Sequence, residues 1–399
     1  MHRRDDRGAV ILAWRRFGPY HYARARAASQ ILPLVGLEIS PIDHVNLWAP
    51  IEHEADFRLL TVFGSEDPKR MQPATLSARI ADALDNVDPE VIVVHGYADR
   101  EALMLMQWAV GRGRQLVLMS ESNAYDAARL APREWIKRRV IRLCSSALVG
   151  GSDARRYLTE LGMPSDRVFL GYDAVDNEHF CRDNGVVAIA PQGPGASRRF
   201  FLASARFISS KNHEGLLEAY AAYRRRAADV AWDLVVLGNG ILRQEIEARR
   251  RDLGIAGHVI LPGFKQYEEL PSWYAAASCF VHPSTTEQWG LVVNEAMAAG
   301  LPVLVSRRCG CAADLVEEGV NGFTFEPHDT RGLAELMYRM AHGAVDREAM
   351  GQASRRIIAD WGPERFADGL VRAVEAALSA APPKATLLDK ALLWALTRR

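Results

Sequence analysis

Two glutamates with seven residues between them stand in TTEQWGLVVNEAMAAGLPVLVS, residues 285–306. Glu287 lies in a loop before Gly290, and Glu295 lies inside the helix that is expected to follow and to end at Gly300. Carboxylates placed in this way could serve as a general acid and base, hold a metal ion, or bind the hydroxyls of one ligand. The neighbouring residues have to distinguish these three kinds of site.

Backbone groups beside the two carboxylates could bind an anion. The N–H groups of Gly290, Leu291 and Val292 are the unpaired donors of the helix's first turn, and they could hold a phosphate. Glu287 would then lie near a sugar beyond the phosphate, and Glu295 could reach a ribose, because carboxylates accept hydrogen bonds from vicinal hydroxyls. In the simpler alternative, Glu287 is only a charge that complements the helix dipole, and Glu295 is only an exposed helical glutamate.

Two more strand ends carry features of the same kind. Arg206 and Lys211, in ASARFISSKN, flank a loop that leads into a helix, and such a pair suits a diphosphate. Taken alone, they read more simply as two solvated surface cations. Gly238 and Gly240, in VVLGNG, permit a tight turn or a close approach of the backbone to a ligand. They lack the three-glycine spacing of a dinucleotide site, which argues against NAD.

The elements that must position these residues are apolar strands that alternate with helices. Strands are expected in AVILAW, EVIVVHG, QLVLMSES and SALVGGS, and then in RFFLASARF, WDLVVLGNG, HVILPGF, SCFVHPS and LPVLVS. Runs that are apolar throughout indicate parallel sheets covered on both faces. The sequence therefore predicts an α/β protein with two Rossmann-like, doubly wound domains that face a cleft. The predicted parts are a first domain at 1–183, a Gly/Pro/Ala-rich linker at 184–199, a second domain at 200–362, and C-terminal helices at 363–399.

Composition limits the class of protein. A chain of 399 residues with 49% apolar and 25% charged residues is typical of a globular protein of two domains. Its formal net charge of zero gives no reason to expect nucleic acid. Five cysteines without CxxC spacing favour a reducing cytoplasm. No signal peptide or membrane-spanning stretch is expected from the sequence.

Two groups of basic residues bear on membrane contact and on the acceptor. One flanks the first loop and the other marks a later helix: Arg15, Arg16, Arg24 and Arg26, and then Lys137, Arg138, Arg139 and Arg142. Each alone reads as part of a solvated helix face. Together they could meet an anionic membrane surface, such as the inner membrane face, or a phosphate-bearing acceptor.

The combined motifs resemble glycosyltransferase family 4, whose members are retaining enzymes of the GT-B fold. The resemblance is carried by Glu287 and Glu295 within GLVVNEAMAAGLPV, by the preceding HPS, by ARFISSKN and by VLGNG, and it is strongest over 200–330. It implies an enzyme of the EC 2.4 class that moves a sugar from a UDP- or GDP-sugar donor to a saccharide or lipid-linked acceptor. Polysaccharide, glycolipid or glycoconjugate biosynthesis is the implied setting.

The resemblance also implies roles for single residues. Arg206 and Lys211 would bind the donor phosphates and stabilise the leaving group, Glu295 would bind the ribose, and Glu287 would contact the donor sugar. His95, at the end of EVIVVHG, would face that sugar from the first domain. The first loop departs from the family pattern, because WRRFGPYHYAR has a single glycine where two adjacent ones are usual.

Fixed cations can replace a metal, and no acidic pair of the metal-dependent sugar transferases stands at a matching strand end, so neither metal nor cofactor is expected. Two rival hypotheses remain open. One is a GT-B hydrolysing epimerase, and the other is a non-catalytic scaffold that binds a nucleotide-sugar.

Overall fold

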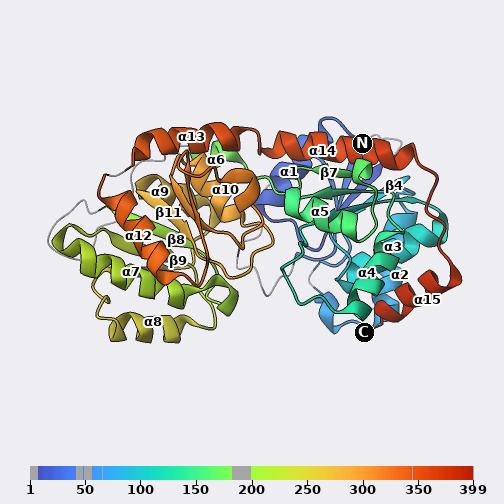
Figure 1. The fold of residues 1–399 in the computed structure, drawn as a ribbon. Helices are drawn as coiled ribbons and strands as arrows, with labels where there is room; N and C mark the ends of the chain where they lie inside the picture. Colours follow the sequence, from blue (N-terminus) through green and yellow to red (C-terminus); the bar gives the residue numbers. More distant parts are fainter. Residues whose placement is uncertain are drawn as a thin grey trace. The chain divides into compact units, whose positions relative to one another are not determined.

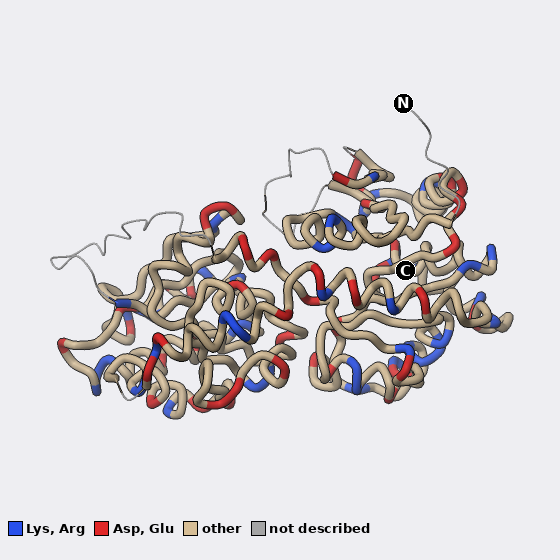
Figure 2. The backbone as a smooth tube through the Cα atoms, turned by 90° about the horizontal axis from the view of Figure 1, so that it is seen from above, with Lys and Arg blue, Asp and Glu red and all other residues tan. Residues whose placement is uncertain are grey.

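The computed structural model describes residues 8–41, 48, 56–64, 66–181, 199–343 and 345–398. Its contacts divide the chain into unit 1, Met1–Ala174 with Pro363–Arg399, and unit 2, Val175–Gly362. Apart from Arg199, the predicted linker lies outside the described residues. Acidic and basic residues are interspersed along the chain, in keeping with its net charge of zero (Figure 2).

Unit 1 is built on a seven-stranded parallel sheet in the order β3-β2-β1-β4-β5-β6-β7. Its strands are β1 Val10–Trp14, β2 Leu34–Glu38, β3 Arg58–Thr61, β4 Val91–Val94, β5 Gln115–Ser120, β6 Ser146–Val149 and β7 Val168–Leu170. Its helices are α1 Pro19–Ser29, α2 Pro73–Asp85, α3 Arg100–Arg112, α4 Ala131–Ile141, α5 Ser152–Glu160, α14 Pro363–Leu378 and α15 Leu387–Leu396. Helices cover both faces of the sheet (Figure 1).

The two faces of this sheet carry separate cores, because successive strand side chains point to opposite sides. Val10, Leu12 and Trp14 of β1 pack with α1 and with Phe366 and Leu370 of α14. The alternate strand residues pack with α2, α3, α4 and α5, and Leu393 of α15 joins that second core. The last two helices of the chain are therefore part of unit 1.

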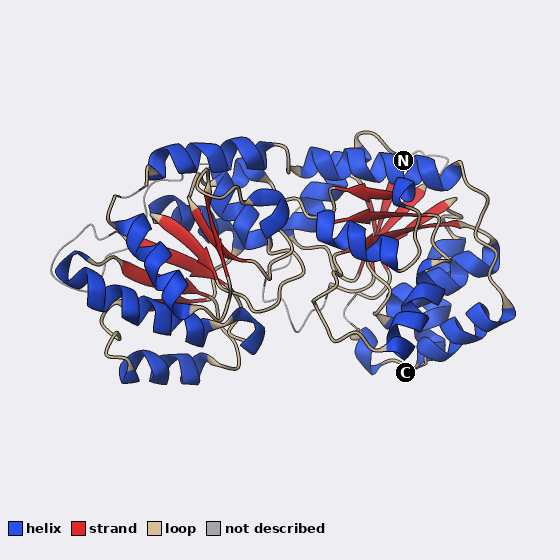
Figure 3. Cartoon of the chain, in the orientation of Figure 1, coloured by secondary structure: helices blue, strands red, loops and turns tan. Residues whose placement is uncertain are grey.

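Unit 2 is built on a six-stranded parallel sheet in the order β10-β9-β8-β11-β12-β13. Its strands are β8 Phe200–Ser204, β9 Asp233–Leu237, β10 Val259–Gly263, β11 Cys279–His282, β12 Val303–Ser306 and β13 Gly322–Phe325. Its helices are α6 Asn177–Cys181, α7 His213–Ala227, α8 Arg243–Asp252, α9 Leu270–Ala276, α10 Leu291–Ala298, α11 Ala312–Leu315, α12 Thr330–Ala341 and α13 Arg347–Ala359. They flank the sheet on both faces (Figure 3).

The boundary between the units differs from the one drawn after residue 183. Helix α6 groups with unit 2, because Phe180 packs edge-on against Tyr267 and Tyr274, with ring centroids 5.6 and 5.8 Å apart. Cys181 Sγ also donates to the carbonyl oxygen of Ala298, at 3.0 Å.

The order of the second sheet contains a switch point between β8 and β11. The chain runs from β8 to β9 and β10 on one side and then returns to β11 on the other side of β8. Loops that leave β8 and β11 at their carboxyl ends therefore diverge, and such a switch point is where open parallel sheets bind ligands.

Candidate functional site

The loops after β8 and β11 are tied together. Asn212, held in the left-handed region at φ 54°, donates from Nδ2 to the carbonyl oxygens of Pro283 at 3.1 Å and Pro327 at 2.7 Å. The backbone N–H of Thr285 donates to Ser210 O at 2.9 Å. These bonds bring Lys211, at the end of the first loop, beside Glu287 in the second.

Four polar side chains form a connected cluster in these loops. Lys211 Nζ donates to Glu287 Oε2, and His282 Nε2 lies 3.2 Å from the same oxygen. Ser284 Oγ lies 3.3 Å from His282 Nε2 and 3.4 Å from Glu287 Oε2. The Lys211 and Glu287 side chains are only 12% and 18% exposed. His282 and Ser284 were not among the site residues predicted from sequence, although HPS stands at the end of a predicted strand.

The cluster holds Glu287 ionised. Burial alone would raise the pKa of this carboxyl, but the hydrogen bond and charge of His282 and the charge and hydrogen bond of Lys211 outweigh it. Together they lower the pKa of Glu287 from 4.5 to about 2. Glu287 is therefore a fixed anion between two basic side chains at neutral pH.

This lowered pKa predicts a pH-dependent contribution to stability. A carboxyl whose pKa falls on folding stabilises the native state above its unfolded pKa, and the stabilisation is lost as the pH falls through the folded pKa. The difference in unfolding free energy between the natural protein and Glu287→Gln should therefore shrink as the pH falls from about 4.5 to about 2. Denaturant titrations over this range test it, with Glu245→Gln, at an exposed site on α8, as the matched control. A difference for Glu287→Gln that stays constant with pH would contradict the assignment.

Arg206 is placed differently from Lys211. Its side chain is exposed and makes no hydrogen bond or ion pair with the residues that the structure describes. Its backbone is fixed, because His213 Nε2 donates to Arg206 O at 3.1 Å. Burial, aided by the charges of His282 and Lys211, lowers the pKa of His213 to about 4, so this imidazole is neutral. A guanidinium free to bind an anion thus sits on a fixed loop.

Gly238 and Gly240 allow two backbone segments of this chain to lie close together. Both have positive φ, at 130° and 159°. A Cβ at Gly238 would lie 1.9 Å from Ala205 O, and one at Gly240 would lie 2.6 Å from Phe207 O. The turn after β9 therefore packs directly on the loop that carries Arg206. A contact of these glycines with a donor stays a prediction.

The N-terminus of α10 faces the cluster. Gly290, at φ 106°, caps this helix, and a Cβ there would lie 3.4 Å from both Glu287 Cγ and His282 Nε2. The first-turn N–H groups of Gly290, Leu291 and Val292 thus begin beside the ionised carboxylate. Phosphate binding by these groups also stays a prediction.

Glu295 is fully buried in α10, which excludes the exposed helical glutamate considered from sequence. Tyr274 Oη, from α9, donates to Glu295 Oε2 at 2.6 Å. Burial, the Glu295 charge and this hydrogen bond raise the pKa of Tyr274. The proposed contact of Glu295 with a ribose would have to form beside Tyr274.

In unit 1, His95 follows β4 and His21 follows the neighbouring strand β1. His95 Nδ1 donates to Ala13 O at 3.2 Å, while its Nε2 lies 3.9 Å from Asp99 Oδ2. His21 Nδ1 accepts from the Gly18 N–H at 3.0 Å. Burial is the main cause that lowers the pKa of both, to about 3 for His21, so both rings are neutral.

Within the part of the chain that the structure describes, no group of three or more His, Cys, Asp or Glu side chains could hold a metal ion. Cys309 and Cys311 are buried thiols, and the Cys311 sulfur would lie 3.6 Å from a Cβ at Gly290. Among the described residues, no helix is long and apolar enough to cross a membrane.

Comparison with known proteins gives one family match. Residues 189–357 match the family described as "Glycosyl transferases group 1". The GDP-mannose-dependent alpha-(1-6)-phosphatidylinositol monomannoside mannosyltransferase of Mycolicibacterium smegmatis is 30% identical over 189 residues, which span 45% of this chain and 49% of that protein. D-inositol 3-phosphate glycosyltransferase 1 of Catenulispora acidiphila is 27% identical over 277 residues, 68% of this chain and 65% of that protein. Both matches cover less than two thirds of the relative's length.

Solved structures share the fold. Anabaena HepE, in complex with UDP and glucose, superposes with a TM-score of 0.72 at 16% identity over 92% of this chain and 99% of that chain. Sucrose-phosphate synthase of Thermosynechococcus elongatus superposes with a TM-score of 0.73 at 17% identity over 93% of this chain and 99% of that chain. The sheet topology and these superpositions confirm the predicted fold, a GT-B fold with two Rossmann-like, parallel-sheet domains.

Proposed function

We propose that this chain, whose residues 189–357 match the group 1 glycosyl transferases, is a retaining glycosyltransferase that uses a UDP- or GDP-sugar. The acceptor would be a saccharide or a lipid-linked saccharide, in polysaccharide, glycolipid or glycoconjugate biosynthesis on the cytoplasmic side of the membrane. The donors are suggested by relatives, since HepE was solved with UDP-glucose and the mycobacterial relative is named as GDP-mannose-dependent.

One observation carries the proposal. At the switch point of the second sheet, Lys211, His282 and Glu287 meet beside the N-terminus of α10, with Arg206 exposed on the adjoining loop. Cations and helix N–H groups at such an edge suit a diphosphate. The ionised carboxylate among them suits the hydroxyls of the attached sugar.

The arrangement would act mainly by electrostatics. When the bond between the sugar and the diphosphate breaks, negative charge develops on the leaving phosphate. Arg206, Lys211 and the N–H groups of Gly290, Leu291 and Val292 would stabilise it without rearrangement. Glu287 would orient the donor sugar and stabilise positive charge at its anomeric carbon.

Catalysis is expected to survive chelation. The positive charge that Mg²⁺ would supply to the phosphates is already present on Arg206 and Lys211, and the cluster's one carboxylate, Glu287, is bonded to Lys211. The check compares the transfer rate in excess EDTA with the rate in added Mg²⁺ or Mn²⁺. Loss of activity in EDTA that metal restores would make Glu287 and Glu295 candidate metal ligands instead.

Glu295→Gln is expected to weaken donor binding by about 1.5–3 kcal/mol, because ribose hydroxyls would lose a charged acceptor. Titration calorimetry with the nucleotide-sugar measures it. Since Glu295 is buried against Tyr274, Tyr274→Phe is the matched control: it removes the hydrogen bond but keeps the carboxylate, and it should bind donor nearly as the natural protein does. Equal affinities for all three proteins would place Glu295 outside the donor site.

The function itself can be tested first with a donor screen. UDP-, GDP- and ADP-sugars are titrated against the full chain, and one of the first two is expected to bind and to raise the melting temperature. Binding should weaken in Arg206→Ala. If none of these donors binds, the proposed function is wrong.

A further inference from the structure

Helix α15 presents an apolar face to solvent. Leu387, Ala391, Trp394 and Ala395 are exposed at helical spacing, and Leu387 is 87% and Trp394 50% exposed. Arg398 continues the same face one turn later, with its guanidinium carbon 3.9 Å from the Trp394 ring centroid. Single exposed apolar side chains are common on protein surfaces, but apolar side chains that are contiguous on one exposed face mark interaction sites.

Helix α4 repeats the pattern. Ala131, Trp135, Arg138 and Arg142 are exposed at the same spacing, and Trp135 is 48% exposed. In each helix a tryptophan is thus followed by arginine toward the C-terminal end. The exposed Leu130, which caps α4, adds a further apolar side chain.

Helices α4 and α15 are in contact through the buried side of α15. Asp389 of α15 binds Arg139 Nη2 of α4 at 2.8 Å and lies 3.7 Å from Arg142 Nη2. Arg139 Nη2 also donates to Thr386 Oγ1, at the cap of α15, at 3.0 Å. Leu393 anchors the other side of α15 in the core of unit 1. We call the exposed faces of α4 and α15 together the α4–α15 surface.

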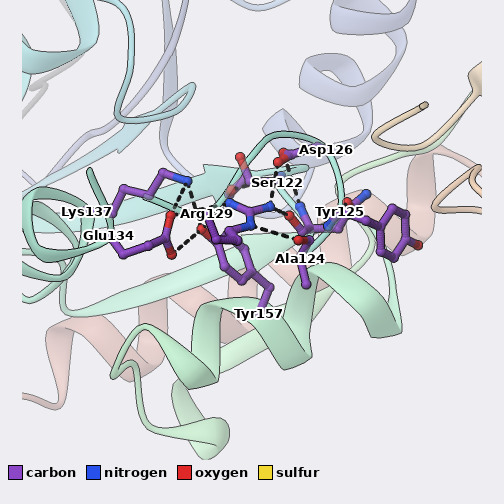
Figure 4. Close-up of polar contacts among 10 residues, drawn as sticks. Ser122, Ala124, Tyr125, Asp126, Arg129, Glu134, Lys137 and Tyr157 are labelled. Carbon is purple, nitrogen blue, oxygen red and sulfur yellow. Dashed lines mark hydrogen bonds and ion pairs between the residues drawn. The ribbon is translucent and has the colours of Figure 1, made fainter. Parts of the chain in front are cut away.

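On both helices the acidic side chains point toward the protein interior, and most of the basic side chains are exposed to solvent. Each helix contains one acidic residue, and both are turned inward. Asp389 is 0% exposed, and Glu134 is 19% exposed and bonded to Tyr157 Oη at 2.8 Å and Lys137 Nζ at 3.0 Å (Figure 4). The exposed charges of the surface are all positive: Arg133, Arg138, Arg142, Lys390 and Arg398.

We propose that the α4–α15 surface binds the face of an anionic lipid bilayer, with Leu387, Trp135 and Trp394 entering the headgroup region and the surrounding arginines and Lys390 contacting the lipid phosphates. This names a membrane partner for the proposed function. The link between this surface and a lipid-linked acceptor rests on the proposed function. The binding of the surface to a bilayer does not.

The combination of side chains favours lipid over a protein partner. Tryptophan sits at the boundary between acyl chains and headgroups, and long basic side chains extend their charge from an apolar surface to phosphate. A surface with apolar and cationic groups but no outward acid has charge complementarity with an anionic leaflet.

Sedimentation of the full chain with vesicles tests this without donor or acceptor. The protein should bind vesicles of phosphatidylcholine and phosphatidylglycerol in equal parts and should be released by salt, and it should bind pure phosphatidylcholine much more weakly. Leu387→Ser/Trp394→Ser and Arg138→Glu/Lys390→Glu should each weaken binding at least about tenfold. Both variants should keep their affinity for the nucleotide-sugar, so this inference can fail independently of the proposed function.

Matched controls lie in unit 2. Val230 and Ile241 are exposed apolar residues, and Arg225 and Arg331 are exposed cations. Val230→Ser/Ile241→Ser and Arg225→Glu/Arg331→Glu should bind the anionic vesicles like the natural protein. Failure of the natural protein to bind, equal binding to neutral vesicles, or equal loss in the controls would overturn the proposal. So would self-association of the chain that Leu387→Ser/Trp394→Ser abolishes without any vesicle binding, because the surface would then be a protein interface.

Discussion

Arg206→Ala is expected to lower kcat at least about 10²-fold while the unfolding free energy stays unchanged. This is the scale for the loss of one preorganised donor at a developing negative charge. Stability should not change, because the side chain is exposed and bonds to none of the described residues. Steady-state kinetics with saturating donor, paired with thermal denaturation, measure both effects.

Arg225→Ala is the matched control for this prediction, since Arg225 is an exposed arginine in the last turn of α7, away from the loop after β8. It should leave both kcat and stability as they are. Normal turnover in Arg206→Ala would show that its guanidinium does not contact the leaving group.

Lys211→Ala is expected to lower kcat by a similar factor and, unlike Arg206→Ala, to destabilise unit 2 as well. Its Nζ is bonded to Glu287, and both side chains are largely buried, so removal leaves a carboxylate without its ammonium partner. A loss of about 1–3 kcal/mol is the scale for such an unsatisfied group. Denaturant unfolding in the absence of donor measures this loss, and steady-state kinetics measure turnover.

Two further variants separate the two effects of Lys211. In Lys211→Ala/Glu287→Gln the remaining side chain is neutral, so much of the lost stability should return while turnover stays low. Lys265→Ala breaks a more exposed pair with Glu269, 3.3 Å apart, and should cost less than about 1 kcal/mol. A stability loss in Lys211→Ala together with normal turnover would mean that the lysine only supports the fold.

The strands found from sequence are those with continuous apolar runs, such as β1, β4 and β5, which are buried on both faces. Four strands, β2, β3, β7 and β13, were not predicted from sequence. β3 is a largely exposed edge strand, β7 has three residues, and β2 and β13 each contain a glycine. The composition of such strands does not reveal them, and they can be identified only from the strands that they pair with in the sheet.

The candidate site shows a similar limit. Local sequence patterns are enough to place four features at strand ends: Arg206, Lys211, Glu287 and the first turn of α10. The contact of Lys211 with Glu287 depends on β8 and β11 being neighbours in the sheet, which no local pattern specifies. Likewise, helical periodicity places Glu295 in α10 but cannot show that Tyr274 packs over it.

The most direct test of the account is transfer of labelled sugar from the donor that binds to a panel of saccharide and lipid-linked acceptors. The natural protein should form labelled product with retained anomeric configuration and release one nucleoside diphosphate per sugar transferred. Arg206→Ala and Lys211→Ala should form the same product at least about 10²-fold more slowly. Donor that binds but is never consumed with any acceptor would indicate a scaffold, and free epimerised sugar formed without an acceptor would indicate a hydrolysing epimerase. Either result would contradict the proposal that this chain is a glycosyltransferase.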